Sequence, residues 1–250
     1  MELTLRKSTL GRAGMLDLLE KLAGTPAEAS LTLYLTPRLP PAELHNLIKE
    51  VPAPPTVSEK LAEIATGSPN GIAIFWSNQA KYLVVPPFPI TEKSLSLSPD
   101  VASVRSLLSH EYHIGIVLVR LGSYAIGVCL GDTLVSSKVG TGLVHGRHRQ
   151  GGSSAHRFER HRDKQIEQFL IRVCGHAREQ LEPYAKALDY MIYGGARTTI
   201  LMLQKYCPLL GKLDKTVLPP LLDIPEPRQA VLENAVSRVW SSVVYAWRED

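Results

Sequence analysis

The hydrophobic positions along the chain recur at two spacings, and together these spacings predict a mixed α/β fold. Between residues 114 and 139, apolar side chains alternate or run together in short segments rich in valine, isoleucine and leucine, which is typical of strands. Between residues 154 and 181, apolar residues recur every three or four positions, which predicts a long amphipathic helix. These helical positions are Ile166, Phe169, Leu170, Val173, Ala177 and Leu181.

The first 88 residues have the pattern of a small α/β domain. Two helices are predicted over residues 15–22 and 58–65, and three strands over residues 31–35, 71–76 and 82–85. Thr56 or Ser58 is the expected N-cap of the second helix. The proline-rich segment at residues 86–89 marks a boundary or a rigid connector. We therefore expect one domain over residues 1–88 and a second over residues 89–250.

The second domain has the pattern of a strand meander followed by alternating helices and strands. Gly122-Ser123 and Gly131-Asp132 fall where tight turns would join three successive strands. This order predicts a mixed sheet with helices packed on it. The predicted strands cover residues 94–98, 114–120, 124–130, 133–139, 188–193 and 217–222, and the predicted helices cover residues 101–108, 154–181, 198–206 and 227–247.

Composition narrows the class of protein. The chain has 250 residues and is 44% hydrophobic, which is enough for one large domain or two small domains with their own cores. It has no apolar run of about 18 residues, so no membrane-spanning helix is expected. The segment Met1–Lys7 lacks the layout of a signal peptide. Three widely spaced cysteines predict no disulfide framework, and a reducing cytoplasm is the expected location.

Positive charge is concentrated in one part of the chain. The formal net charge is +4, yet residues 141–178 alone contain eight Lys/Arg and three Asp/Glu. A local basic segment of this kind indicates an anionic partner. The alternative interpretation is a solvated helix face with no binding role.

At the start of this basic segment, a glycine pair lies within a run of cations. Gly151 and Gly152 are preceded by Arg147 and Arg149 and followed by Arg157 and further basic residues. Adjacent glycines allow backbone conformations closed to other residues and let a ligand approach the main chain closely. Arginines on both sides indicate that the ligand carries phosphates. The segment is therefore predicted to be a flexible loop that contacts RNA.

The same segment resembles a known loop. Residues 147–160 are similar to the Gly-Gly-Gln loop of eukaryotic and archaeal class I peptide-chain release factors, where the pattern is K-H-x-x-G-G-Q-S-A-x-R-F-x-R. The matching positions are His148, Gly151, Gly152, Ser154, Ala155, Arg157, Phe158 and Arg160. The surrounding sequence also resembles the central domain of those factors, strongly over residues 90–250 and more weakly over residues 1–88.

The resemblance implies a ribonuclease-H-like domain with a mobile loop that enters the peptidyl-transferase centre and promotes attack of water on the peptidyl-tRNA ester. The codon-reading motif of true release factors has no clear match in residues 1–88. The chain therefore resembles the VLRF-type peptidyl-tRNA hydrolases of ribosome quality control, which act on stalled large subunits without reading a stop codon. The domain at residues 1–88 would then dock on the ribosome.

The catalytic glutamine of that family is absent. Ser153 occupies its position, or Ser154 in the register that the rescue hydrolases use, and Gln150 lies on the other side of the glycines. Ester hydrolysis needs a positioned water and a donor for the developing oxyanion, and a backbone N–H supplies the donor whatever the side chain. Two interpretations remain open: a slower or differently tuned hydrolase loop, and a factor that binds the ribosome or tRNA without chemistry.

The resulting prediction is a ribosome rescue factor that hydrolyses peptidyl-tRNA. Its expected partners are the large-subunit rRNA and peptidyl-tRNA, with no membrane, cofactor or metal ion. The predicted catalytic residues are Gly151, Gly152, Ser153 and Ser154, and the predicted nucleic-acid contacts are Arg147, His148, Arg149, Gln150, His156, Arg157 and Arg160. Phe158 is expected to anchor the end of the loop in the core, because it shares a helical face with Ile166.

Three other assignments, namely a metal site, a general base and a nuclease, are less favoured by the residues. His145, His148, His156 and His161 suggest a metal site, but structural zinc sites usually add cysteine or use a closed set of four ligands. His156 has the right chemistry for a general base. An RNA-processing nuclease would need converging carboxylates for two metal ions, and Glu111, Asp132 and Asp189 are far apart in the sequence.

Overall fold

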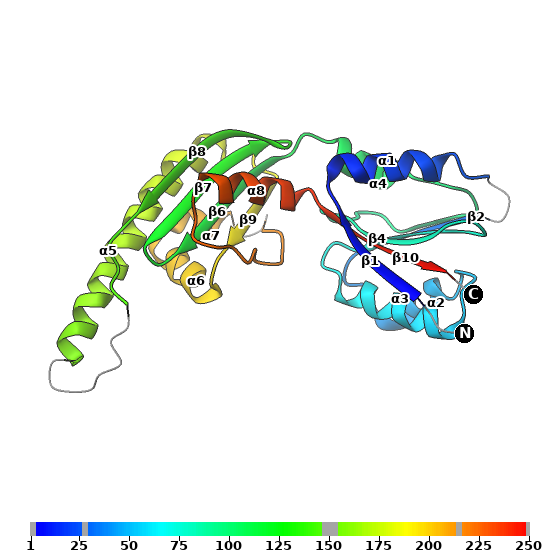
Figure 1. The fold of residues 1–250 in the computed structure, drawn as a ribbon, viewed down its shortest axis with the longest axis horizontal. Helices are drawn as coiled ribbons and strands as arrows, with labels where there is room; N and C mark the ends of the chain where they lie inside the picture. The colour runs from blue at the N-terminus through cyan, green and yellow to red at the C-terminus, as the bar shows by residue number, and fades with distance from the viewer. Residues whose placement is uncertain (1–3, 27–29, 147–154, 214–216, 249–250) are drawn as a thin grey trace. The chain divides into compact units, whose positions relative to one another are not determined.

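The computed structural model describes residues 4–26, 30–146, 155–213 and 217–248, which form two compact units (Figure 1). Unit 1 comprises Met1–His110 and Ser237–Asp250, and unit 2 comprises Glu111–Val236. These boundaries differ from the expected division after residue 88, because the segments on both sides of unit 2 join the same sheet and helix layers of unit 1. Both units mix helices and strands, which confirms the α/β class.

Unit 1 is built on a six-stranded antiparallel sheet in the order β1-β10-β4-β3-β2-β5. Figure 1 shows helices α1 and α4 on one face of this sheet and α2 and α3 on the other. The strands are β1 (Thr4–Leu10), β2 (Ser30–Leu35), β3 (Ile72–Ser77), β4 (Lys81–Val85), β5 (Ser94–Ser96) and β10 (Ser242–Arg248), and the helices are α1 (Arg12–Ala23), α2 (Pro41–Ile48), α3 (Pro55–Gly67) and α4 (Ala102–Ser109).

Helices on both faces explain the sequence of strand β2. All six of its residues are buried, as expected for a strand with no solvent-facing side. Leu33 belongs to the core cluster that contains Leu61 of α3. Tyr34 alternates to the opposite face, where its ring packs edge-on against Phe75 with 6.1 Å between the ring centroids.

The C-terminal part of unit 1 corrects one sequence prediction. The helix predicted over residues 227–247 ends at Val239, and Ser242–Arg248 forms β10 between β1 and β4. This last segment is rich in valine and aromatic residues, which pack well on a pleated sheet, and Trp247 is only 3% exposed. Pairing with two strands overrides the helical periodicity. The predicted N-cap of α3 was also wrong, because this helix begins at Pro55 with Pro54 before it.

Unit 2 contains a four-stranded sheet in the order β8-β7-β6-β9. β6 (His113–Arg120), β7 (Ser123–Leu130) and β8 (Thr133–Thr141) form an antiparallel meander, and β9 (Tyr190–Gly194) pairs in parallel with β6. The predicted turns are confirmed, since Gly122 and Gly131 have φ of +101° and +59°, a region that favours glycine. This is the ribonuclease-H-like arrangement that the sequence resemblance implies.

Helices cover both faces of this second sheet. They are α5 (Ala155–Leu181), α6 (Arg197–Tyr206), α7 (Pro208–Lys212) and α8 (Gln229–Val239). α5 and α6 bury their apolar stripes against one face, in a cluster that includes Val117 and Ile126. On the other face, α8 approaches β7 so closely that a Cβ on Gly127 would lie 3.1 Å from Leu232 Cδ2.

The N-terminal part of α5 extends beyond the sheet (Figure 1). From Arg157 to Lys164 its described side chains are exposed or half-buried, and Ile166 is the first buried residue. We call residues 155–165 the stem. Within the described ranges, no helix is long and apolar enough to cross a membrane.

Tyr34 provides a test of the core of unit 1. Its buried hydroxyl donates a hydrogen bond of 2.7 Å to the Asp100 carbonyl, and burial, followed by the negative charge of Asp100, raises the pKa of its phenol. We expect Tyr34→Phe to lower the free energy of unfolding by about 1 kcal/mol at neutral pH, the usual net value of one hydrogen bond.

The same variant tests the pH dependence of stability. Because the folded state disfavours the phenolate, the contribution of Tyr34 is present below its ordinary pKa of 10 and is lost as the pH rises above it. Tyr34→Phe should therefore lose less stability than the wild type in denaturant unfolding above pH 10. An identical alkaline loss in both proteins would contradict this assignment.

Candidate functional site

The predicted functional residues fall into two groups. Eight of them lie outside the described residues, namely Arg147, His148, Arg149, Gln150, Gly151, Gly152, Ser153 and Ser154. The other three belong to the first turns of α5, where Arg157 and Arg160 have exposed side chains and only the backbone of His156 is described. The structure therefore describes the two segments that flank the predicted loop, namely residues 142–146 after β8 and the stem.

Side chains of α5 hold the segment that leads into the loop. Arg162 Nε donates a hydrogen bond of 2.9 Å to the His145 carbonyl, and the His145 N–H donates one of 3.1 Å to Gln165 Oε1. The imidazole rings of His145 and His161 lie beside each other, with 6.5 Å between their centroids. Both backbone polar groups of His145 are therefore bonded to the stem, which fixes where the loop begins.

The end of β8 also packs tightly against α5. A Cβ on Gly142 would lie 2.7 Å from Cδ2 of Phe169, a ring that is buried in the core of unit 2. At Gly140 the Tyr124 hydroxyl occupies the space that a side chain would need. Arg172 Nη1 donates a long hydrogen bond of 3.4 Å to the Thr141 carbonyl. The absence of a side chain at Gly142 lets the end of the strand approach α5, and the absence of one at Gly140 leaves room for Tyr124 of β7.

The stem presents positive charge to the solvent. Arg157, Arg160 and Lys164 are exposed, and the acidic residues Glu159 and Asp163 lie among them. The expectation that Phe158 anchors the loop in the core was wrong, since this side chain is 58% exposed. Its helical spacing from Ile166 was correct, but α5 does not reach the sheet before Ile166. Contact of the arginines with phosphates remains a prediction.

No metal centre is found in the part of the chain that the structure describes. His145 and His161 are neighbours, but no group of three or more His, Cys, Asp or Glu side chains among the described residues could hold a metal ion. The side chains of His148 and His156 lie outside those residues.

The three carboxylates that a nuclease site would use, Glu111, Asp132 and Asp189, lie at one end of the unit 2 sheet. Asp189 accepts a hydrogen bond of 2.8 Å from the His113 N–H, and the Glu111 carboxylate occupies the space beside Gly131. Strand pairing thus brings together residues that are distant in the sequence. They form no metal-binding group among the described residues, so the structure provides no support for two-metal cleavage.

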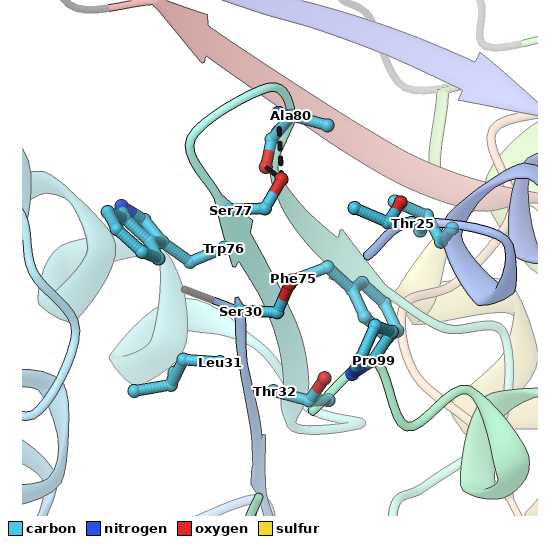
Figure 2. Close-up of a pocket in the computed structure, with 10 residues that line it drawn as sticks. Thr25, Ser30, Leu31, Thr32, Phe75, Trp76, Ser77, Ala80 and Pro99 are labelled. Atoms are coloured by element: carbon cyan, nitrogen blue, oxygen red, sulfur yellow. Dashed lines mark hydrogen bonds between the residues drawn. The ribbon is translucent and has the colours of Figure 1, made fainter. Parts of the chain in front are cut away.

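Unit 1 contains a small pocket near the turn that joins β3 and β4 (Figure 2). Phe75 and Trp76 line it from β3, and Ser77 Oγ closes the turn by hydrogen bonds to both the N–H and the carbonyl of Ala80. Its cavity volume of about 10 Å³ gives room for one water molecule at most. We therefore assign no ligand to it.

Comparisons with known proteins agree with the sequence resemblance. A family model described as "Actinobacteria/chloroflexi VLRF1 release factor" matches residues 112–245, more than half of the chain. The peptide chain release factor subunit 1 of Aeropyrum pernix is 25% identical over 213 residues, covering 74% of this chain and 55% of that protein. The same factor from Archaeoglobus fulgidus is 31% identical over 96 residues, covering 38% and 24% respectively.

Two solved structures are also similar. The archaeal translation termination factor aRF1 aligns with a TM-score of 0.39 and 19% identity, covering 92% of this chain and 73% of that one. The Vms1 mitochondrial localization core aligns with a TM-score of 0.43 and 12% identity, covering 78% and 86%. Of the two curated relatives above, the chain spans about half the length of one and a quarter of the other.

Fold, basic stem and family match together define a protein of the release-factor class. The chain belongs to the VLRF1 release factor family of Actinobacteria and Chloroflexi. Membership connects it with translation termination and rescue, and it confirms the family indicated by the sequence.

The packing of β8 on α5 can be tested with two glycines. We expect Gly142→Ala to lower the free energy of unfolding by about 1–3 kcal/mol, because the new methyl group would overlap the buried ring of Phe169. Gly146 is the matched control, since a Cβ there meets no atom within 4 Å. Gly146→Ala should change stability by no more than about 0.5 kcal/mol. Equal effects of the two substitutions in denaturant unfolding would contradict the proposed packing.

Proposed function

We propose that this protein rescues stalled ribosomes by hydrolysing the ester bond of peptidyl-tRNA on the large subunit. The observation that carries the proposal is a diglycine segment joined at both ends to a basic helical stem, in a chain that belongs to a release factor family. The reactive part would be residues 151–154, and the stem would hold it at a distance from the core of unit 2.

The chemistry that this segment would supply is mainly positional. Water oxygen attacks the ester carbonyl carbon, the bond to the ribose oxygen breaks, and the tRNA leaves with a free hydroxyl group. The slow step requires an aligned water and a hydrogen-bond donor for the oxyanion. The backbone N–H of Ser153 would be that donor, and the glycines before it would let the main chain approach the ester.

The stem would provide the binding energy and the direction. Arg157 and Arg160 are exposed on its first turns and would contact phosphates, which position a protein on RNA without reading its sequence. The two hydrogen bonds between α5 and His145 would hold the beginning of the loop against the same helix that follows its end. A small displacement of the reactive segment would slow such a reaction strongly, so a fixed attachment of the loop to α5 would favour it.

One observation favours a second candidate function. The serine at the position of the family's glutamine is compatible with a factor that binds the ribosome or tRNA and does no chemistry. The same scaffold and the same basic surface would serve both functions. Only a measurement of ester hydrolysis separates them.

The decisive experiment is single-turnover release of a labelled peptide from peptidyl-tRNA on purified large subunits. We expect release by the wild type and a loss of about 100-fold in Gly151→Ala/Gly152→Ala, because the backbone would no longer reach the ester in the right geometry. Ser153→Ala is the matched control that keeps the backbone donor and should retain most of the rate. Ser153→Gln should raise the rate if the family's side chain assists at this position.

Two outcomes would refute the hydrolase. Release that does not exceed that of a variant lacking residues 147–154 would leave the binding factor as the function. Normal release by the double alanine variant would show that the glycines are not the reactive part.

The basic residues of the loop and stem give a separate prediction about binding. Replacing Arg147, Arg149, Arg157 and Arg160 by alanine should weaken association with ribosomes and make it less dependent on salt. Each phosphate contact that is lost lowers the number of counterions that binding releases. The measurement is ribosome co-sedimentation over a series of salt concentrations.

A control removes the same charge from other exposed positions of unit 2. It replaces Arg178, Lys186, Lys205 and Lys212, which are all exposed and follow the stem in the sequence. Equal losses in the two variants would mean that net charge alone governs binding, and the loop and stem would then have no special role.

A further inference from the structure

A groove lies between the stem side of α5 and the residues that follow β8. Its volume is about 300 Å³, at the lower end of the range of small-molecule sites. Gly142 and Leu143 form one wall, and a single face of α5 forms the other, with residues spaced three or four apart. The helical residues are His161, Lys164, Gln165, Gln168, Phe169 and Arg172.

The groove follows from the contacts that hold the loop. The hydrogen bonds of His145 with Arg162 and Gln165 keep the incoming segment beside the helix at one end. Gly142 touches Phe169 at the other end, where it leaves no room for a side chain. Between these two points the groove opens beside Leu143, whereas Val144 packs against the core of unit 2.

The lining of the groove is basic and partly apolar. Lys164 and Arg172 contribute two positive charges, and none of the described residues lining the groove is acidic. Leu143, which is 72% exposed, adds an apolar side chain at the rim. Gln165 and Gln168 add carboxamides, which can both donate and accept hydrogen bonds.

We propose that this groove binds one nucleotide of single-stranded RNA. Lys164 and Arg172 would hold the backbone phosphate, the base would lie between the Leu143 side chain and the His161 imidazole, and the glutamines would meet the edge of the base. Sites for single-stranded RNA combine cations, which contact the backbone, with apolar or ring side chains, on which a base stacks. The proposal rests on the function proposed above, in which this side of unit 2 meets RNA.

Other occupants match the groove less well. A free phosphate would use the two cations but would leave Leu143 uncovered and most of the volume empty. A double helix is too wide to enter a cavity of this size, whereas one unstacked nucleotide presents a phosphate, an apolar face and polar edges together. The groove therefore selects for an extended, unpaired strand.

The test measures binding of a fluorescent ten-nucleotide oligouridylate to the full chain by anisotropy over a series of salt concentrations. In Lys164→Gln/Arg172→Gln we expect weaker binding, and the slope of log affinity against log salt concentration should be smaller by about 0.7, because one phosphate contact on a single strand contributes about that much. Gln168→Trp keeps both charges and fills the groove, and it should weaken binding about tenfold by excluding the base.

Arg178→Gln/Lys186→Gln is the matched control, because it removes two exposed cations of unit 2 that do not line the groove. It should bind the oligonucleotide with the wild-type salt slope. The proposal is overturned if the control and the groove variants lose the same affinity, if Gln168→Trp binds as the wild type does, or if the wild type fails to bind the oligonucleotide. It is also overturned if polyglutamate of equal charge competes as well as unlabelled RNA.

The peptide-release assay keeps this inference separate from the proposed hydrolase. Loss of oligonucleotide binding in the groove variants supports the groove even if the wild type releases no peptide. Peptide release by the wild type, together with unchanged oligonucleotide binding in the groove variants, refutes the groove and leaves the hydrolase intact.

Discussion

The close packing of the β8 end against α5 is the constraint on which the candidate functional surface depends. Gly142 lies against the ring of Phe169, and about one and two turns earlier along the helix Gln165 and Arg162 bond both backbone groups of His145. These contacts join an edge strand to a helix that continues beyond its own sheet. Without them, the chain entering residues 147–154 would have no fixed starting point relative to the stem.

Unit 2 separates the positioning of residues from the chemistry they would perform. Its buried stripe from Ile166 to Leu181 carries the packing energy, and the exposed turns before Ile166 carry the charges. A helix can hold a neighbouring segment at a fixed distance and direction, because its length and direction are set by backbone hydrogen bonds. The same division places the basic groove at the junction, where the helix leaves the sheet.

Sequence patterns predicted most of unit 2 and less of unit 1. The meander, its two glycine turns and the long helix depend on local periodicity and turn chemistry, which a single sequence displays. β10 depends on pairing with strands more than 150 residues away, and no local pattern shows such a partner. The exposure of Phe158 was missed for a related reason, since periodicity gives the face of a helix but not where the sheet beneath it ends. The hydrogen bonds of Gln165 and Arg162 to His145 left no signal in the sequence.

The place of β10 has a consequence for how the protein is made. Leu5 pairs with Trp247, and in the unit 1 sheet β1 has β10 as its neighbour, so β1 lacks this partner until residues 242–248 have been synthesised. Unit 2, by contrast, is one uninterrupted stretch of chain. Loop-closure entropy favours contacts between residues that are near in sequence. During synthesis unit 2 can therefore fold while the sheet of unit 1 still has an unpaired strand edge. In this partly folded state the protein would be a substrate for chaperones.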